Sequence, residues 1–195
     1  METIDMVIDE STDWSGIVSA ISLTDTPAIE AEAVALSKEE KVKLTAIDED
    51  RRIFMGAVLI PDKKILRKKE DGSYYNIRFP KETVSRASQI FLEKGNQNNS
   101  TLEHEVSLSG NTVTESWIIE DEVHDKSRKF GLNHPVGTWM VSMKITDDKT
   151  WEMAKTGDVK GFSIEGMFSG EKTESSDMAL LKAIEEEVDN ALKQL

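Results

Sequence analysis

The sequence predicts an α+β protein built mainly from short strands with a few helices. Several apolar runs of strand length are bounded by turn residues, and two segments carry both a helix start and a helix stop signal. With 195 residues, of which 38% are apolar, the chain can bury the core of one ordinary domain. We expect an N-terminal arm with the first strand or strands over residues 1–50, a core over 51–170, and a linker with a C-terminal helix over 171–195.

The first expected strands lie in the N-terminal half. Residues 14–23 (WSGIVSAISL) form one apolar segment, followed by a turn at Pro27. Residues 52–61 (RIFMGAVLIP) are densely apolar and end in proline, which is typical of a buried strand. SYYNIRF alternates after the turn residue Gly72, so a further strand is expected there. The pattern from Ser37 resembles a capping box and fits either a short helix or a polar arm.

A helix is expected over residues 80–95. Pro80 stands at the position of a helix start, and apolar side chains recur at helical spacing through Val84, Ala87 and Ile90. The segment closes on Lys94-Gly95, a basic last turn followed by a glycine stop.

A hairpin is expected over residues 101–119. LEHEVSLS and TVTESWII flank Gly110-Asn111, which favours a two-residue turn. That register would place His104 opposite Trp117 and put Glu115 diagonal to His104 on the same face. Residues 120–135 are rich in charge and are expected to form an exposed loop.

The remaining elements follow in order. GTWMVSMKI, from Gly137, is expected to be a strand, and Asp147 or Asp148 can cap a helix that Gly157 ends. VKGFSIEGMF, residues 159–168, is expected to be a strand whose glycines mark a bulge or a close backbone approach. Residues 177–195 are expected to form an amphipathic helix after a polar linker, which favours docking on another subunit or on a partner.

Composition excludes several functions. The net charge of −13 repels phosphate and disfavours direct binding of nucleic acid. Cysteine is absent, which removes disulfides, thiolate zinc sites and cysteine nucleophiles. His124 and His134 lie in the charged loop without the spacing of a metal site, and no glycine-rich phosphate loop occurs, so no metal or cofactor is expected. The acidic start lacks the regions of a secretory signal, and no apolar run is long enough for a membrane span.

Serine chemistry has candidate residues. Ser163 lies in KGFSIEG between two glycines that allow a substrate backbone to approach, and His104 lies in TLEHEVSL between two glutamates. From spacing alone, a strand serine is more commonly structural. Two carboxylates could orient the imidazole: Glu165, two residues after Ser163 on the same strand face, or Glu115 through the expected hairpin. A solvated glutamate beside a Ser-His dyad is the third alternative.

The longer pattern resembles a known family. LEHEVSL, ESWIIED, GTWMVSMKI and TWEMAKTGDVKGFSIEGMF, with DTPAIEAEAVALSKEE and RIFMGAVLIPDKKI upstream, are similar in content and order to the XkdF-like prohead serine proteases of tailed phages. That family is related to the prohead maturation proteases and the herpesvirus assemblins. The resemblance implies a small mixed or antiparallel β-barrel flanked by helices, with Ser163 as nucleophile and His104 as general base. Related proteases draw their third group from sequence after the serine, which favours Glu165.

The resemblance also implies a function. It points to a serine endopeptidase that acts inside the phage prohead, in the host cytoplasm, and forms homo-oligomers there. Its substrates would be segments of the scaffold and major capsid proteins and the protease itself. The alternative is a protease-like domain without activity that serves as a scaffold or core component of the prohead.

Overall fold

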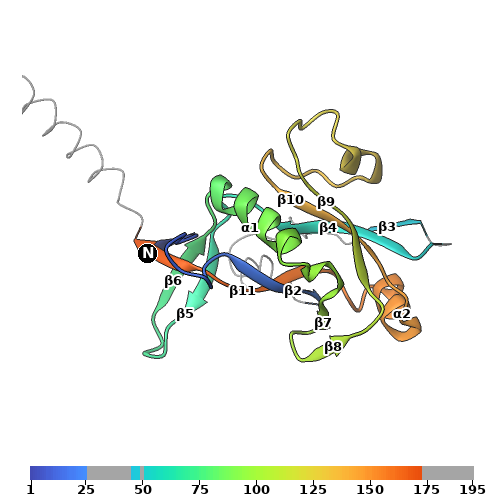
Figure 1. The fold of residues 1–195 in the computed structure, drawn as a ribbon, viewed down its shortest axis with the longest axis horizontal. Helices are drawn as coiled ribbons and strands as arrows, with labels where there is room; N and C mark the ends of the chain where they lie inside the picture. Colours follow the sequence, from blue (N-terminus) through green and yellow to red (C-terminus); the bar gives the residue numbers. More distant parts are fainter. Residues whose placement is uncertain (26–44, 49–50, 173–195) are drawn as a thin grey trace, which may run out of the picture.

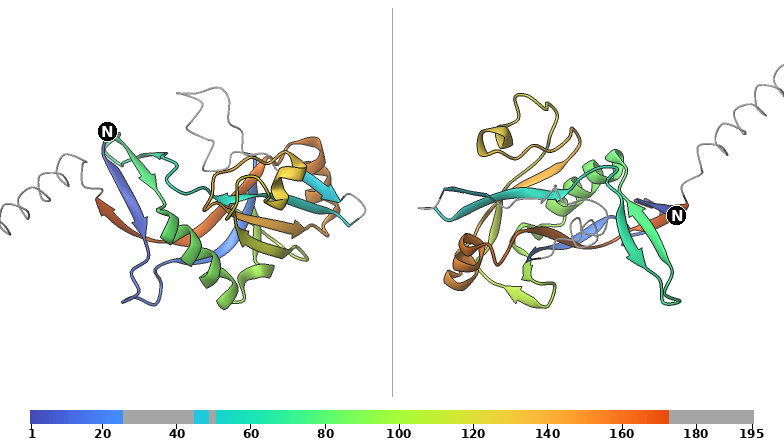
Figure 2. Two further views of the ribbon diagram at one scale, coloured as in Figure 1. Left: turned by 90° about the horizontal axis from the view of Figure 1, so that it is seen from above. Right: turned by 180° about the vertical axis from the view of Figure 1, so that it is seen from behind.

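Strands dominate the structure. In the computed structural model, which describes residues 1–25, 45–48 and 51–172, twelve strands form three four-stranded sheets (Figure 1). The strands are β1 (Thr3–Val7), β2 (Ile17–Thr24), β3 (Thr45–Asp48), β4 (Ile53–Leu59), β5 (Ile65–Lys68), β6 (Tyr74–Arg78), β7 (Ser100–Leu102), β8 (Val106–Leu108), β9 (Thr112–Ile118), β10 (Trp139–Lys144), β11 (Gly161–Met167) and β12 (Ser169–Lys172). Their orders are β12-β1-β6-β5, β3-β4-β10-β9 and β11-β2-β7-β8. The β5–β6 hairpin projects at one end of the molecule, and the second helix lies at the other (Figures 1 and 2).

Two sheets share a bent pair of strands. β1 pairs antiparallel with β12, and β2 pairs antiparallel with β11, so the same two stretches of chain run through both sheets. The ladder is interrupted between Val7 and Ile17 on one side and at Phe168 on the other. β1–β6 and β2–β7 are parallel pairs. The bend therefore separates the β11-β2-β7-β8 sheet from the sheet that carries the β5–β6 hairpin.

Two helices cover the core. Helix α1 (Lys81–Glu93) packs on β2, β9 and β10, and Phe91 meets Trp139 edge to face with ring centroids 5.5 Å apart. Helix α2 (Asp148–Thr156) begins at Asp147, whose carboxylate accepts a 2.7 Å hydrogen bond from the backbone N–H of Thr150, and ends at Gly157 in the left-handed region. The starts and ends of the two helices match the proline, aspartate and glycine signals in the sequence.

The α+β class is confirmed, and the expected barrel is not. Within the described residues each sheet is open, with β12 and β5, β3 and β9, and β11 and β8 as its edges. No ladder among these residues joins the edges, because the pairing is interrupted between β1–β12 and β2–β11 and the two pairs belong to separate open sheets. The expected helix over 177–195 and the alternatives at Ser37 lie outside the described residues.

The expected strands over 14–23, 52–61, 73–79, 137–145 and 159–168 are confirmed as β2, β4, β6, β10 and β11. The expected hairpin over 101–119 is wrong. β8 pairs with β7, whereas β9 pairs with β10 in another sheet. The carbonyl of Gly110 accepts a 2.7 Å hydrogen bond from the Thr146 hydroxyl, and the Asn111 side chain accepts one from Thr146 N at 3.2 Å. The Gly110-Asn111 segment is thus held against residue 146 and leads the chain from one sheet to the next.

Candidate active site

Ser163 lies in the middle of edge strand β11. It pairs with Ser22 on β2, and Ser22 pairs with Thr101 on β7, so the three residues form a polar row across the sheet. The neighbouring Phe162 is fully buried in the core. Because side chains alternate along a strand, burial of Phe162 directs Ser163 to the opposite face. Ser163 itself is 4% exposed.

His104 lies in the turn between β7 and β8, which corrects the expectation of a strand position. Glu103 and His104 have φ of 52° and 59° and are adjacent residues in the left-handed region. A side chain in that region costs about 1–2 kcal/mol per residue, so the surrounding contacts must hold the turn.

Strand β2 holds this turn through hydrogen bonds. The backbone N–H of Glu103 donates to the Leu23 carbonyl at 3.0 Å, and its carboxylate accepts from Thr24 Oγ1 and from Asp25 N, both at 2.7 Å. The backbone N–H of His104 donates to Ser22 Oγ at 3.0 Å. Ser22 and Thr24 are buried, so the bonds that their hydroxyl groups make to Glu103 and His104 are partly shielded from water. The turn is therefore fixed to the strand that pairs with the candidate nucleophile.

Glu165 contacts His104. Its Oε1 lies 3.3 Å from His104 Nδ1, and the side chains are 30% and 41% exposed. The Thr101 hydroxyl donates to the same Oε1, and the Glu165 carbonyl accepts a 3.0 Å hydrogen bond from Ser19 Oγ. A register shift between Glu165 and Gly166 forms the bulge expected from the glycine. Glu165 is consequently placed between β7 and the His104 turn.

Glu115 lies in a different sheet. Its carboxylate accepts hydrogen bonds from Lys126 Nζ at 2.8 Å and Ser142 Oγ at 2.5 Å. The ammonium of Lys126, then the hydroxyl of Ser142, hold the pKa of Glu115 below its ordinary value. The register that placed this glutamate diagonal to His104 is wrong, because β8 and β9 do not pair.

The other two histidines occupy the charged loop, which extends beyond β9 and β10 and contains a short 3-10 helix, η3 (Lys126–Phe130) (Figure 1). His124 is exposed, and its Nδ1 lies 2.9 Å from the Asp121 carboxylate. Hydrogen bonds from the side chain of His124 and from the backbone N–H groups of His124 and Val123 lower the Asp121 pKa to about 2. The carbonyl of His134 accepts from Arg128. In the part of the chain that the structure describes, no cluster of three or more metal-ligating side chains occurs. No helix in that part is long and apolar enough to cross a membrane.

Ser163, His104 and Glu165 supply a hydroxyl, an imidazole and a carboxylate from one region of the sheet. Ser22 links Ser163 and His104, because it pairs with Ser163 across the sheet and its hydroxyl accepts a hydrogen bond from the backbone N–H of His104. Among the described residues no direct hydrogen bond joins Ser163 to His104. Such catalytic bonds are often long in the absence of substrate. Sequence reasoning missed Ser22, although polar residues inside the buried run ISLT were a signal.

A hydroxyl, an imidazole and a carboxylate are the side-chain groups that a serine hydrolase uses. Residues 41–174 match the model of the family described as "Putative phage serine protease XkdF". That match covers more than half of the chain and includes all three residues, so the chain belongs to this family. No curated protein and no solved structure shows significant similarity to the chain.

Proposed function

We propose that the protein is a serine endopeptidase of the phage prohead, with Ser163 as nucleophile, His104 as general base and Glu165 as the residue that orients the imidazole. The observation that carries this proposal is the 3.3 Å distance between Glu165 Oε1 and His104 Nδ1. Glu165 lies two residues after Ser163 on the same strand. A carboxylate on one ring nitrogen and a serine hydroxyl in the same region of the sheet are the groups that acyl transfer by a serine nucleophile uses.

The proposed reaction follows from the nitrogen that Glu165 engages. With Nδ1–H donating to the carboxylate, Nε2 is left to accept the proton of Ser163 as its Oγ attacks a peptide carbonyl. His104 then gives this proton to the departing amine as the C–N bond breaks. Water hydrolyses the resulting ester, again through His104. Backbone N–H groups near Ser163, aided by Gly161 or Gly166, are the proposed donors to the oxyanion.

The proposed substrates are segments of the scaffold and major capsid proteins and the protease itself, cleaved inside the prohead in the host cytoplasm, where the chain would form homo-oligomers. Membership of a phage serine protease family supports this setting. The net charge of −13 is consistent with a protein that leaves DNA to other head components.

The test uses the full chain and a fluorophosphonate probe, which reacts with activated serines. We expect a mass increase on the Ser163 peptide, no labelling of Ser163→Ala, and a rate at least about 10³-fold lower in His104→Ala. The same variants should fail to process scaffold and capsid protein when produced together with them. His124→Ala is the matched control, because this exposed histidine also bonds a carboxylate, and its rate should change less than about tenfold.

Two outcomes would contradict the proposal. Normal processing in either Ser163→Ala or His104→Ala would remove the assignment of the site. A wild-type chain that is folded, is not labelled and cleaves nothing in assembled heads would favour a component of the prohead without catalytic activity.

A further inference from the structure

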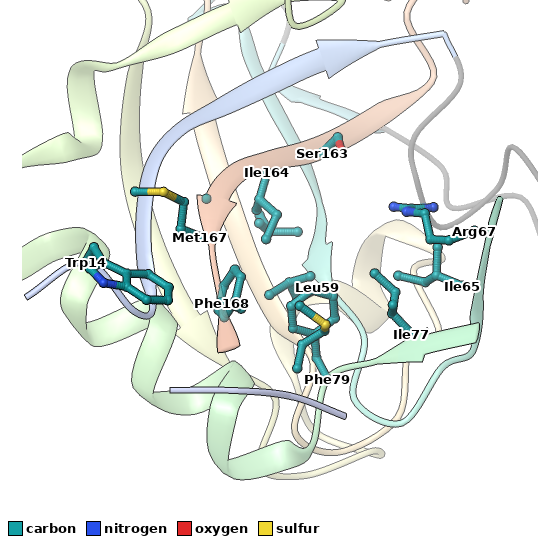
Figure 3. Close-up of a pocket in the computed structure, with 13 residues that line it drawn as sticks. Trp14, Leu59, Ile65, Arg67, Ile77, Phe79, Ser163, Ile164, Met167 and Phe168 are labelled. Atoms are coloured by element: carbon teal, nitrogen blue, oxygen red, sulfur yellow. The ribbon is translucent and has the colours of Figure 1, made fainter. Parts of the chain in front are cut away.

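An apolar pocket lies beside the strand that carries Ser163. Its volume is about 390 Å³, and Figure 3 shows side chains from several strands converging on it. Leu59 and Phe79 are almost fully buried in its wall, whereas Trp14 and Met167 are 44% and 56% exposed. Among the lining residues Arg67 is the one with a charge. The pocket is thus an apolar recess with large apolar side chains at exposed positions.

Strand β11 connects the pocket to the candidate nucleophile. Ile164 points into the pocket beside Leu59, and Ser163 lies at its edge (Figure 3). β11 pairs with β2 along one side, and no other strand of the described residues pairs with it. An edge strand offers unpaired backbone N–H and C=O groups, along which an extended peptide can bind.

Such a peptide would present its side chains alternately to the two faces of the sheet. On β11 these faces differ: Ser163 and Glu165 belong to the polar face, and Ile164 to the pocket face. A carbonyl placed at Ser163 would therefore have a neighbouring side chain directed toward the pocket.

We propose that this pocket is a specificity pocket that receives a large apolar side chain, such as Leu, Met or Phe, next to the scissile bond of the polypeptide substrate. The inference rests on the function proposed above and adds the class of residue that is recognised. Binding would expel water from an apolar wall, which favours large apolar side chains over small ones. Lysine and arginine are disfavoured, since the guanidinium of Arg67 lies in the same lining.

The experiment digests a defined mixture of peptides with the full-length protein and identifies each cut by mass spectrometry. We expect Leu, Met or Phe at one position beside the cut, with alanine there cleaved about 100-fold more slowly. Two variants change the pocket. Ile77→Trp narrows it and should lower cleavage at Leu or Phe at least about tenfold relative to alanine. Met167→Asp alters an exposed position, where folding is least at risk, and should admit lysine at the same subsite.

Tyr74→Trp is the matched control for Ile77→Trp, because Tyr74 lies on the same strand but is exposed and outside the pocket. Its cleavage profile should equal that of the wild type. Cleavage by the wild type without preference for large apolar residues beside the cut would overturn the pocket assignment and leave the proposed function in place. An unchanged profile in Met167→Asp would do the same. Absence of any cleavage, with Ser163 unlabelled by fluorophosphonate, would overturn both.

Discussion

Ser22→Ala tests how the His104 turn is held. Ser22 is fully buried, and its hydroxyl accepts the backbone N–H of His104 at 3.0 Å. Without this acceptor, a partly buried N–H loses its partner, which costs about 1–3 kcal/mol. A loss of that size is comparable with the strain of Glu103 and His104, about 2–4 kcal/mol for two residues in the left-handed region. The turn is then free to relax and to move the imidazole away from Glu165.

Two measurements follow from this balance. For a chain of this length, a loss of about 1–3 kcal/mol lowers the melting temperature by about 2–12 °C. Labelling of Ser163 by fluorophosphonate should slow by about 10- to 100-fold. Each loss of about 1.4 kcal/mol in the stability of the turn conformation that places His104 beside Glu165 lowers the labelling rate about tenfold.

Ser142→Ala is the matched control. Ser142 is also a fully buried strand serine, and its hydroxyl donates to Glu115 at 2.5 Å in a different sheet. We expect a similar loss of stability and an unchanged rate of Ser163 labelling. The reasoning is refuted if Ser22→Ala keeps both wild-type stability and wild-type labelling. Equal slowing in both variants would show that general destabilisation, rather than positioning of His104, governs the rate.

Gly166→Ala should destabilise the protein by about 1–3 kcal/mol in urea unfolding, because the added Cβ would lie 2.8 Å from the backbone oxygen of Ile17. Gly170→Ala should cost less, since its Cβ would meet only a side-chain methyl group at 3.0 Å, and equal losses would contradict this account. Glu115 has a lowered pKa in the folded protein, chiefly through Lys126, so its contribution to stability is present above its unfolded-state pKa and is lost as pH falls through the folded-state value. The free energy of unfolding of the wild type should therefore approach that of Glu115→Gln as the pH is lowered from about 7 to about 3. A difference between the two proteins that stays constant with pH would contradict the assignment.

Local signals in the sequence were sufficient for most individual elements. The dense apolar run of β4 and the capping residues of the helices act within a few neighbours, so they could be recognised without knowledge of the fold. Strand pairing depends on partners far along the chain. Gly110-Asn111 has the composition of a hairpin turn, yet its hydrogen bonds to Thr146 connect two sheets, and Thr146 is distant in sequence.

The candidate site shows the same division. Alternation along β11 correctly placed Ser163 and Glu165 on one face, because that relation is local. The turn at His104 could not be predicted, since the usual sign of a left-handed backbone is glycine or asparagine, and Glu103 and His104 are neither. Hydrogen bonds to Ser22 and Thr24 hold the strained turn, and both residues are far from it in sequence. No local sequence pattern can indicate such a contact.

The edge position of β11 also has a consequence for biosynthesis. β2, β7 and β8 pair with one another without β11, so the ribosome can release the His104 turn and its support on β2 well before Ser163 and Glu165 are translated. Ser163 joins only when β11, the last strand of this sheet in chain order, adds to its open edge. Under the function proposed above, the three proposed catalytic residues therefore come together only when this sheet is complete.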